Sequence, residues 1–181
     1  MSRIDLVVKR HSLTTNFDAL YFWEDHPLTY LIREATHSDL DTLLSFEQGI
    51  ISAERPYDPT LKPDPISYYD IKAMIDSPDA VVIVAEFDQT IVASGYAKHR
   101  ASRHYTTPET HAFLGMMYVQ PEHRGKGVNG KVLDTLLDWA RSQNLLEVHL
   151  TVYPENEAAC RAYRKVGFEP YILEMRMGLD D

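Results

Sequence analysis

Cysteine is nearly absent from this sequence, since Cys160 is the only one among 181 residues. No intramolecular disulfide can form, and nothing in the cysteine content points to an oxidising compartment. A single domain of this length buries about two-thirds of the surface of its unfolded chain. The sequence therefore predicts a fold held together by its hydrophobic core, without a disulfide or a structural metal.

Long apolar runs and an excess of basic residues are also missing. The longest purely apolar run, 80–85, is too short to cross a bilayer, and residues 1–9 lack the apolar core of a secretion signal. The formal net charge is −9, whereas binding to a phosphate backbone requires clustered Lys and Arg. These absences predict a cytoplasmic protein whose partners are neither membranes nor nucleic acids.

The remaining pattern predicts one α/β domain over residues 29–181, preceded by an N-terminal extension (1–28) without sustained periodicity. Residues 126–143 carry apolar side chains at helical spacing, and 146–153 alternate between apolar and polar residues as in a half-exposed strand. Three consecutive strands before that helix predict an antiparallel meander within a mixed, mostly antiparallel sheet flanked by helices. The expected strands are 30–35, 80–87, 90–98, 111–119, 146–153 and 168–177, and the expected helices are 36–48, 66–75, 126–143 and 156–166, with a Pro-rich loop over 49–65.

A glycine-rich turn joins the third strand of the meander to the long helix. Gly125, Gly127 and Gly130 form GxGxxG, residues 125–131 form GxxxxGK, and residues 124–129 approximate RxxGxG. In each of these motifs, glycines let the backbone approach an anion, and the amides and dipole of the helix start bind phosphate. All three interpretations therefore predict a pyrophosphate ligand.

The surroundings of the turn separate the three interpretations. A P-loop needs Ser or Thr after its Lys, and this chain has Val132 there. A dinucleotide fold begins with such a turn and ends the next strand with an acid. Here the turn follows three strands, and Glu147 begins the next strand. Both nucleotide-binding interpretations are therefore disfavoured.

The third interpretation carries a family resemblance. The turn and a second motif, Asn156-x-x-Ala159-x-x-x-Tyr163-x-x-x-Gly167-Phe168, occur in the order typical of the GNAT superfamily of N-acetyltransferases, which the element order over 30–177 also resembles. Asn129 departs from the small residue of the family motif. The resemblance implies the GNAT fold, with a central splay between two parallel strands, and an enzyme that transfers the acetyl group of acetyl-CoA to a primary amine by direct attack.

The resemblance also implies roles for individual residues at the cofactor site. The main chain of Met117, Tyr118 and Val119 is expected to bind the pantetheine arm, with Asn156 as a further contact, although Asn156 is equally well explained as a helix N-cap. The pyrophosphate is expected on the turn, with charge-assisted bonds from the basic side chains. The turn residues concerned are Arg124, Gly125, Lys126, Gly127, Val128, Asn129 and Gly130.

For catalysis, the family places a tyrosine such as Tyr163 next to the sulfur, as the acid for the leaving thiolate. A core aromatic is the alternative interpretation. His111 is the first candidate for the base because histidine titrates near neutral pH, with Glu109, Glu54 or a water chain as alternatives. The eight histidines show no ligand pair at helical or strand spacing, so we predict no metal.

The acceptor is the least determined part of this interpretation. A small-molecule or peptide amine is expected, selected by the loop 49–65 and the first two helices, and the surplus of acids over bases between Ser38 and Asp79 favours cations. A catalytically inactive acetyl-CoA-binding sensor, or a protein that binds NAD or ATP through the same turn, is the alternative. The sequence does not distinguish a monomer from a homodimer.

Overall fold

Five strands form one sheet in the order β1-β2-β3-β4-β5. The computed structural model describes residues 29–179, so the predicted N-terminal extension lies outside the described residues. The strands are β1 (Leu31–Glu34), β2 (Ala80–Phe87), β3 (Thr90–Ala101), β4 (Thr110–Val119) and β5 (Val148–His149). The helices are α1 (Leu40–Glu54), α2 (Ile71–Asp76), α3 (Val128–Ser142) and α4 (Glu157–Val166), with two 3-10 turns, η1 (His37–Asp39) and η2 (Pro121–His123).

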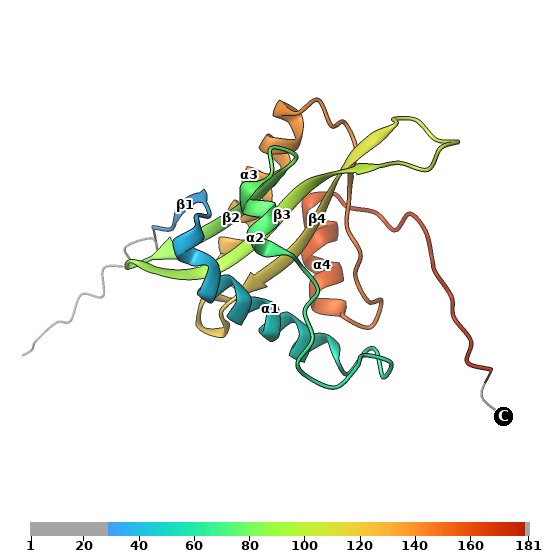
Figure 1. Ribbon diagram of the computed structural model, residues 1–181, viewed down its shortest axis with the longest axis horizontal. Helices are drawn as coiled ribbons and strands as arrows, with labels where there is room; N and C mark the ends of the chain where they lie inside the picture. The colour runs from blue at the N-terminus through green and yellow to red at the C-terminus, as the bar shows by residue number, and fades with distance from the viewer. Residues whose placement is uncertain (1–28, 180–181) are drawn as a thin grey trace, which may run out of the picture.

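The sheet confirms the predicted mixed architecture (Figure 1). Strands β1 to β4 pair antiparallel in chain order, and β5 joins β4 in parallel. The predicted turn at Asp88 and Gln89 connects β2 to β3, and both residues have positive φ (48° and 60°). This is the backbone that lets a two-residue hairpin follow the twist of its strands.

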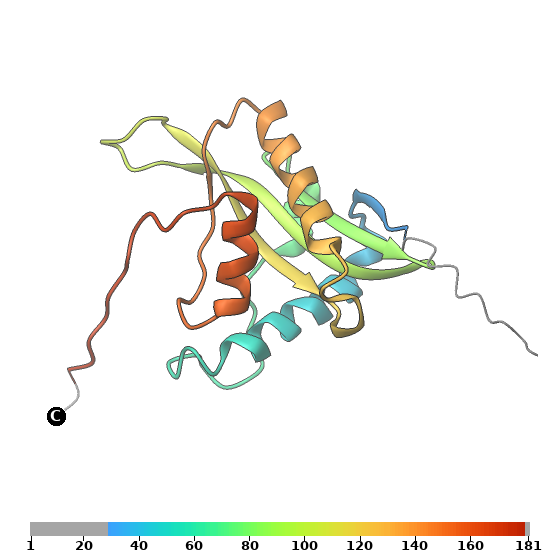
Figure 2. The same cartoon turned by 180° about the vertical axis from the view of Figure 1, so that it is seen from behind.

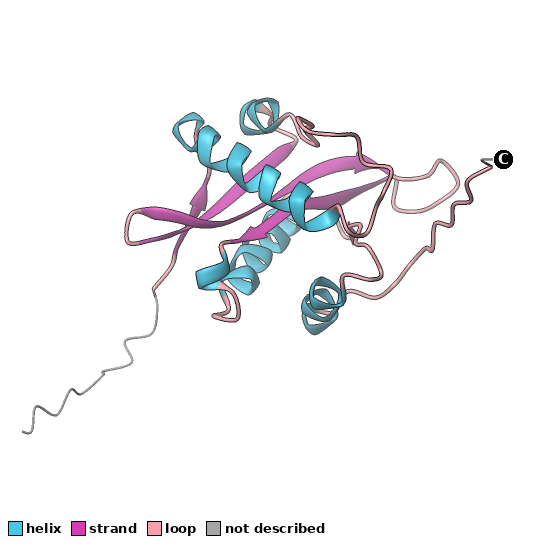
Figure 3. Ribbon diagram, turned by 90° about the horizontal axis from the view of Figure 1, so that it is seen from below, coloured by secondary structure: helices cyan, strands magenta, loops and turns pink. Residues whose placement is uncertain are grey.

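Helices cover both faces of the sheet (Figures 2 and 3). Helices α1 and α2 lie on one face, and α3 and α4 on the other. The apolar stripe predicted for α3 is buried on the sheet, which fixes the helix that follows the glycine-rich turn. Its buried residues are Val128, Val132, Leu133, Leu136 and Ala140.

The first helix is longer than the sequence predicted. It continues to Glu54, whereas Gly49 and the prolines after it suggested an end at Gln48. A Cβ at Gly49 would lie 2.6 Å from the ring of Tyr118 on β4, so glycine here permits close packing of helix on sheet. The second helix begins late, at Ile71, because the Asp70 side chain accepts a hydrogen bond from the Ala73 amide and caps it there.

The predicted final strand over 168–177 is wrong. The predicted cap at Gly167 is confirmed, with φ of 109°, but the residues after it form no strand. The strand predicted over 146–153 shrinks to Val148–His149, because the chain leaves β4 after two paired residues. Because β5 is only two residues long, the residues after Gly167 have no long strand beside which to form a further strand.

Candidate functional site

The glycine-rich turn lies between the end of β4 and the start of α3. Gly125 and Gly127 have φ of 73° and 81°, and Gly127 is the N-cap of α3. Side chains at both positions would be strained, although a Cβ there would meet no atom within 4 Å. The two glycines are therefore required by the backbone geometry of the turn and leave open space above it.

The amides of this turn are free to bind an anion. Within the described residues, no oxygen accepts a hydrogen bond from the amide of Gly125, Lys126, Gly127, Val128 or Asn129. The next two amides, those of Gly130 and Lys131, donate to the Gly127 carbonyl. Five consecutive free amides at the positive end of a helix dipole match the requirements of a phosphate group.

Arg124 supports the turn as well as carrying charge. Its Nε donates a 3.0 Å hydrogen bond to the Val119 carbonyl at the end of β4. The side chain is exposed, and the other nitrogens of its guanidinium remain available. Arg124 can therefore tie the turn to β4 and still donate to a bound anion.

A splay opens between β4 and β5. The two strands pair only at Ala112–Val148 and Phe113–His149, so β4 residues 114–119 have no strand on that side among the described residues. The unpaired main chain includes Met117, Tyr118 and Val119, the residues predicted to bind the pantetheine arm. Because β4 ends at Val119 and only η2 separates it from the glycine-rich turn, this open strand edge leads along the chain to the free amides.

A β-bulge lies on β4 within the splay. Met116 has a φ of 53°, which is uncommon for a residue with a side chain, and the pairing with β3 shifts by one residue beside it. In a regular strand, Leu114 and Met116 would face the same side. Here Leu114 packs with the α3 cluster and Met116 packs on the opposite face with Leu43. The bulge therefore changes which main-chain groups face the splay, a feature that the sequence did not predict.

Asn156 and Tyr163 come from α4, beside the splay. The Asn156 side chain accepts a 3.2 Å hydrogen bond from the Ala159 amide, which confirms its N-cap role. Tyr163 packs on Phe168, with ring centroids 6.0 Å apart, and on the core cluster under α3. Burial, followed by the negative charge of Glu54, raises the pKa of Tyr163 to about 12. The hydroxyl is therefore protonated at neutral pH.

Glu54 lies at the end of α1, among tyrosines. It is partly buried, burial raises its pKa, and it has no ion-pair partner among the described residues. Burial is the main cause of the raised pKa of Tyr68 and Tyr153, and the charge of Glu54 contributes to both, as it does at Tyr163. The charge of Glu54 thus acts on four phenols, those of Tyr68, Tyr69, Tyr153 and Tyr163.

Two further observations describe the packing of these tyrosines. The Tyr68 hydroxyl is buried beside the Glu54 carboxyl group, and this contact lowers the pKa of Glu54 against the effect of burial. Tyr57 stacks on Tyr153 with ring centroids 5.8 Å apart, and the Tyr153 hydroxyl donates to Asp58. Sequence reasoning missed Tyr57, Tyr68 and Tyr153. Their only signal was an excess of tyrosine around a Pro-rich loop.

His111 lies apart from this cluster. It is buried at the start of β4, stacks on His149 at 4.0 Å, and shares a 2.9 Å hydrogen bond with the Ser102 hydroxyl. Burial, followed by the charge of His149, lowers its pKa. His111 is five residues before Met116, roughly 16 Å along an extended strand. No contact between His111 and Tyr163 is found among the described residues, and the role of His111 as the base stays a prediction.

Most acidic side chains between residues 38 and 79 are engaged within the fold. Glu47 is fully buried and accepts hydrogen bonds from the Tyr68 and Tyr69 amides at 2.6 and 2.8 Å. The surplus of acids is thus largely structural and does not form a general surface for cations. The others with partners are Asp39 on Arg33, Asp58 on Arg176, Asp64 on Arg55, Asp76 on His37, and Asp70 as the N-cap of α2.

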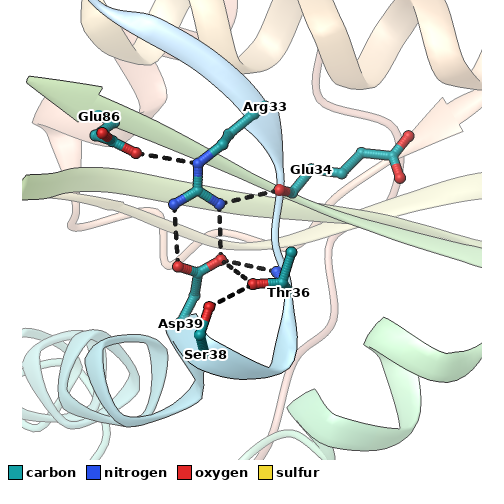
Figure 4. Close-up of polar contacts among 6 residues, drawn as sticks. All are labelled: Arg33, Glu34, Thr36, Ser38, Asp39 and Glu86. Carbon is teal, nitrogen blue, oxygen red and sulfur yellow. Dashed lines mark hydrogen bonds and ion pairs between the residues drawn. The ribbon is translucent and has the colours of Figure 1, made fainter. Parts of the chain in front are cut away.

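The largest of these clusters is structural. Arg33 donates to both Asp39 oxygens, at 2.7 and 3.0 Å, and its Nε donates to Glu86 at 3.1 Å (Figure 4). The bonds from Arg33 hold the Asp39 pKa at about 2, against the opposing effect of burial. Each charged group in the cluster has its partner there, so it fastens β1 to the start of α1.

Comparison with known proteins identifies the family. Residues 47–168 match the Acetyltransferase (GNAT) family. The chain belongs to the GNAT family. The N-alpha-acetyltransferase RimI of Mycobacterium tuberculosis is 28% identical over 153 residues, which cover 84% of this chain and 85% of that protein. The resemblance inferred from the two motifs is confirmed.

Other curated relatives match over shorter stretches. An uncharacterized N-acetyltransferase of Bacillus subtilis, YobR, is 40% identical over 57 residues, which cover 32% of this chain and 23% of that protein. An uncharacterized Mycobacterium leprae protein is 29% identical over 146 residues, covering 81% of this chain and 36% of that protein. The chain therefore spans about a quarter to a third of the length of these two relatives.

Solved structures share the fold at low sequence identity. A predicted acetyltransferase of Clostridium acetobutylicum, solved with acetyl-CoA, superposes with a TM-score of 0.64 at 19% identity, covering 83% of this chain and 97% of that one. An aminoglycoside 6'-N-acetyltransferase of Acinetobacter haemolyticus gives 0.61 at 18% identity, covering 83% and 99%. These likenesses show the GNAT fold.

Two searches of the described residues concern other classes of partner. Over residues 29–179, no helix is both long and apolar enough to span a membrane. The same residues contain no group of three or more His, Cys, Asp or Glu side chains that could hold a metal ion.

Proposed function

We propose that the chain transfers the acetyl group of acetyl-CoA to the primary amine of a positively charged acceptor. Five free amides between Gly125 and Asn129 support the pyrophosphate site, and the open edge of β4 supports a site for the pantetheine arm. When bound, acetyl-CoA supplies an activated acyl group. Every other function in the reaction comes from side chains and amides of this chain.

The observation that carries the proposal is the pairing of Glu54 with Tyr163. Burial raises the pKa of both groups: at about 12 the pKa of Tyr163 keeps it a phenol at neutral pH, and the raised pKa of Glu54 makes that carboxyl group a stronger base than an exposed one. A carboxyl group and a phenol differ widely in ordinary pKa, so the two can serve as base and acid in one reaction. Glu54 is therefore our candidate base, and Tyr163 our candidate acid.

The proposed reaction balances its protons between these two groups. The bound ammonium first loses one proton to water and becomes the neutral amine. Its nitrogen then bonds to the acetyl carbon as the carbon–sulfur bond breaks, and Glu54 takes the second proton from that nitrogen, directly or through water. Tyr163 then gives its proton to the departing thiolate, whose conjugate acid titrates near 8.5 on the cysteine scale. Transfer of the proton on Glu54 to Tyr163 through solvent restores both groups after the thiol has formed. Main-chain amides at the β4 bulge are the candidate donors to the developing negative charge on the acetyl oxygen.

Acceptor selectivity follows from the same cluster. Tyr68 and Tyr153 lie close enough to Glu54 for its charge to raise the pKa of each phenol, and Tyr57 stacks on Tyr153. An ammonium group gains from both a carboxylate and ring faces, whereas an anionic acceptor would be repelled. This replaces the broader expectation that the whole acidic stretch attracts cations, because most of those acids have partners within the fold.

The test compares two single variants with wild type, using release of free thiol from acetyl-CoA with a panel of cationic, neutral and anionic amines. We expect Glu54→Gln to lower kcat/KM for cationic amines by about 10² to 10⁴ and to remove the acid limb of the pH profile. His111→Gln is the matched comparison. Loss of that limb in His111→Gln with activity retained in Glu54→Gln would make His111 the base. Acetyl-CoA binding without turnover on any amine would instead indicate an inactive binding module.

A further inference from the structure

Glu47 lies on α1 with its side chain fully buried. Its carboxyl group accepts hydrogen bonds from the main-chain amides of Tyr68 and Tyr69, at 2.6 and 2.8 Å, and from the Ser67 hydroxyl at 3.0 Å. In the part of the chain that the structure describes, no basic side chain pairs with it. A carboxyl group is costly to bury, and here these three hydrogen bonds are what offset that cost.

The same helix carries the candidate base. Glu54 comes seven residues after Glu47, which is close to two full turns of an α-helix, so both side chains leave α1 on the same side. Their surroundings differ, because Glu47 is fully buried whereas Glu54 is only partly buried. Of the two carboxyl groups, only that of Glu54 is open to a substrate.

Tyr68 contacts both of these carboxyl groups. Its main-chain amide donates to Glu47, and its hydroxyl is buried beside Glu54. The main chain of this tyrosine is thus fixed by the first glutamate, and the end of its side chain meets the second. A shift of the main chain at Tyr68 would carry the hydroxyl away from Glu54.

Tyr69 fixes the same segment, 67–69, against the sheet. Its ring packs edge to face on the ring of Tyr96 on β3, with centroids 5.4 Å apart. The Tyr96 ring in turn covers Gly115 on β4, where a Cβ would lie 2.6 Å from it. Segment 67–69 is therefore held between α1 and the sheet, and the hydrogen bonds to Glu47 are its attachment on the α1 side.

We propose that Glu47 is a positioning residue for acetyl transfer: it holds the Tyr68 main chain so that the Tyr68 hydroxyl stays against the Glu54 carboxyl group. Because it is fully buried, Glu47 acts through Tyr68 and touches neither acetyl-CoA nor the amine. The inference rests on the proposed role of Glu54 as the base.

The Tyr68 hydroxyl favours the form of Glu54 that accepts a proton. Its contact lowers the pKa of Glu54 against the larger effect of burial, because a hydrogen bond to a carboxylate stabilises the charged form. Loss of this contact should therefore raise the pKa of Glu54 and move the acid limb of the kcat/KM profile to higher pH. The other titratable or charged groups that act on this pair are Tyr69, Tyr153, Tyr163 and Arg55.

The first experiment records pH profiles of thiol release from acetyl-CoA, with the best cationic amine, for Tyr68→Phe, Glu47→Gln and the double variant. Tyr68→Phe removes only the hydroxyl, and Glu47→Gln keeps one oxygen for the main-chain amides. We expect each single variant to move the acid limb to higher pH and to lower kcat/KM on that limb by about tenfold. Because Glu47 acts through Tyr68, the double variant should lie no more than about twofold below the more affected single variant.

Glu47→Leu tests the same contact more severely, since leucine keeps no acceptor for the two amides. It should therefore impair kcat/KM more than Glu47→Gln does. If Glu47→Leu does not fold, the milder Glu47→Gln carries the test. Acetyl-CoA affinity, measured by calorimetry, should stay near wild type in Glu47→Gln, because none of the hydrogen bonds of Glu47 involves the glycine-rich turn.

Asp39→Asn is the matched control for loss of stability alone. Asp39 is also a buried carboxylate (6% exposed) and accepts a 2.7 Å hydrogen bond from the Thr36 amide, but it precedes α1, at the opposite end from Glu54. We expect Asp39→Asn to lower the melting temperature while leaving the acid limb and the KM for the amine as in wild type.

Two results would overturn the role of Glu47: an acid limb that stays in place in Glu47→Gln, or a shift in the double variant equal to the sum of the two single shifts. Glu54→Gln separates this failure from failure of the proposed function. If Glu54→Gln keeps the acid limb, both the proposed base and this inference are wrong. If it removes the limb while Glu47→Gln leaves the limb unmoved, only the role of Glu47 is wrong.

Discussion

The Ser94 hydroxyl donates a 3.1 Å hydrogen bond to the Met116 carbonyl, and both residues are buried. This bond ties β3 to the bulge on β4 at the point where the pairing register shifts. Met116 has a positive φ that costs free energy and persists only when the surrounding structure fixes it. Ser94 is thus a positioning residue for the β4 main chain in the splay.

We therefore expect Ser94→Ala to destabilise the fold by about 1–2 kcal/mol, because a buried carbonyl loses a donor. The relaxed bulge should also raise the KM for acetyl-CoA or lower kcat, since catalysis is sensitive to small misplacement. Denaturant unfolding and steady-state kinetics measure the two effects. A loss of stability with unchanged kinetics would show that the bulge keeps its geometry without Ser94.

At the turn, Gly127→Val is expected to weaken acetyl-CoA binding more than Arg124→Ala. Valine strains the backbone at a φ of 81° and fills the space above five free amides, whereas Arg124 is exposed and supplies one solvated charge. Asn144→Val is the control for strain alone, because Asn144 has a φ of 58° at the opposite end of α3. Calorimetric titration with acetyl-CoA decides, and near-wild-type affinity for Gly127→Val would exclude the turn as the binding site.

Tyr163→Phe is expected to lower kcat by about 10² to 10⁴ while leaving acetyl-CoA affinity nearly unchanged. The substitution keeps the ring that packs on Phe168 and removes only the proton donor. Kinetics with the best acceptor, together with a melting curve, measure the effect. Unchanged kcat at every pH would leave Tyr163 as a core aromatic and assign the proton to water or another donor.

The Arg33–Asp39 pair predicts how stability responds to acid. Because the folded-state pKa of Asp39 is about 2, below its ordinary 3.8, the ionised form stabilises the fold. This contribution, about 2 kcal/mol, is fully present above pH 4 and is lost as the pH falls toward 2. Asp39→Asn should remove it and flatten the acid limb of the stability curve. Asp76→Asn, which breaks an exposed pair with His37, should cost less than 1 kcal/mol, and equal losses in the two variants would contradict this.

The sequence predicted the parts of the fold that local rules decide. The Asp88–Gln89 turn, the apolar face of α3, the αL cap at Gly167 and the N-cap at Asn156 each depend on residues close in the chain. These elements, together with the glycines of the turn, were enough to indicate the family.

Features that depend on distant residues were not predictable in this way. Gly49 suggested a helix end because its contact with Tyr118, a residue on a distant strand, cannot be inferred from the residues around Gly49. The bulge at Met116 is held by a hydrogen bond from Ser94 on the neighbouring strand. The tyrosines near Glu54 come from segments that are far apart in sequence. The final strand failed for the same reason, because alternation indicates a strand but does not supply a neighbour for it.

The central claim is tested most directly by the release of free thiol from acetyl-CoA when wild-type protein meets the amine panel, with Tyr163→Phe assayed alongside. We predict release that depends on a cationic primary amine, with the acetylated amine formed in equal amount, and a large loss in Tyr163→Phe although it still binds acetyl-CoA. Release only with neutral or anionic acceptors, or equal turnover by the two proteins, would contradict the account.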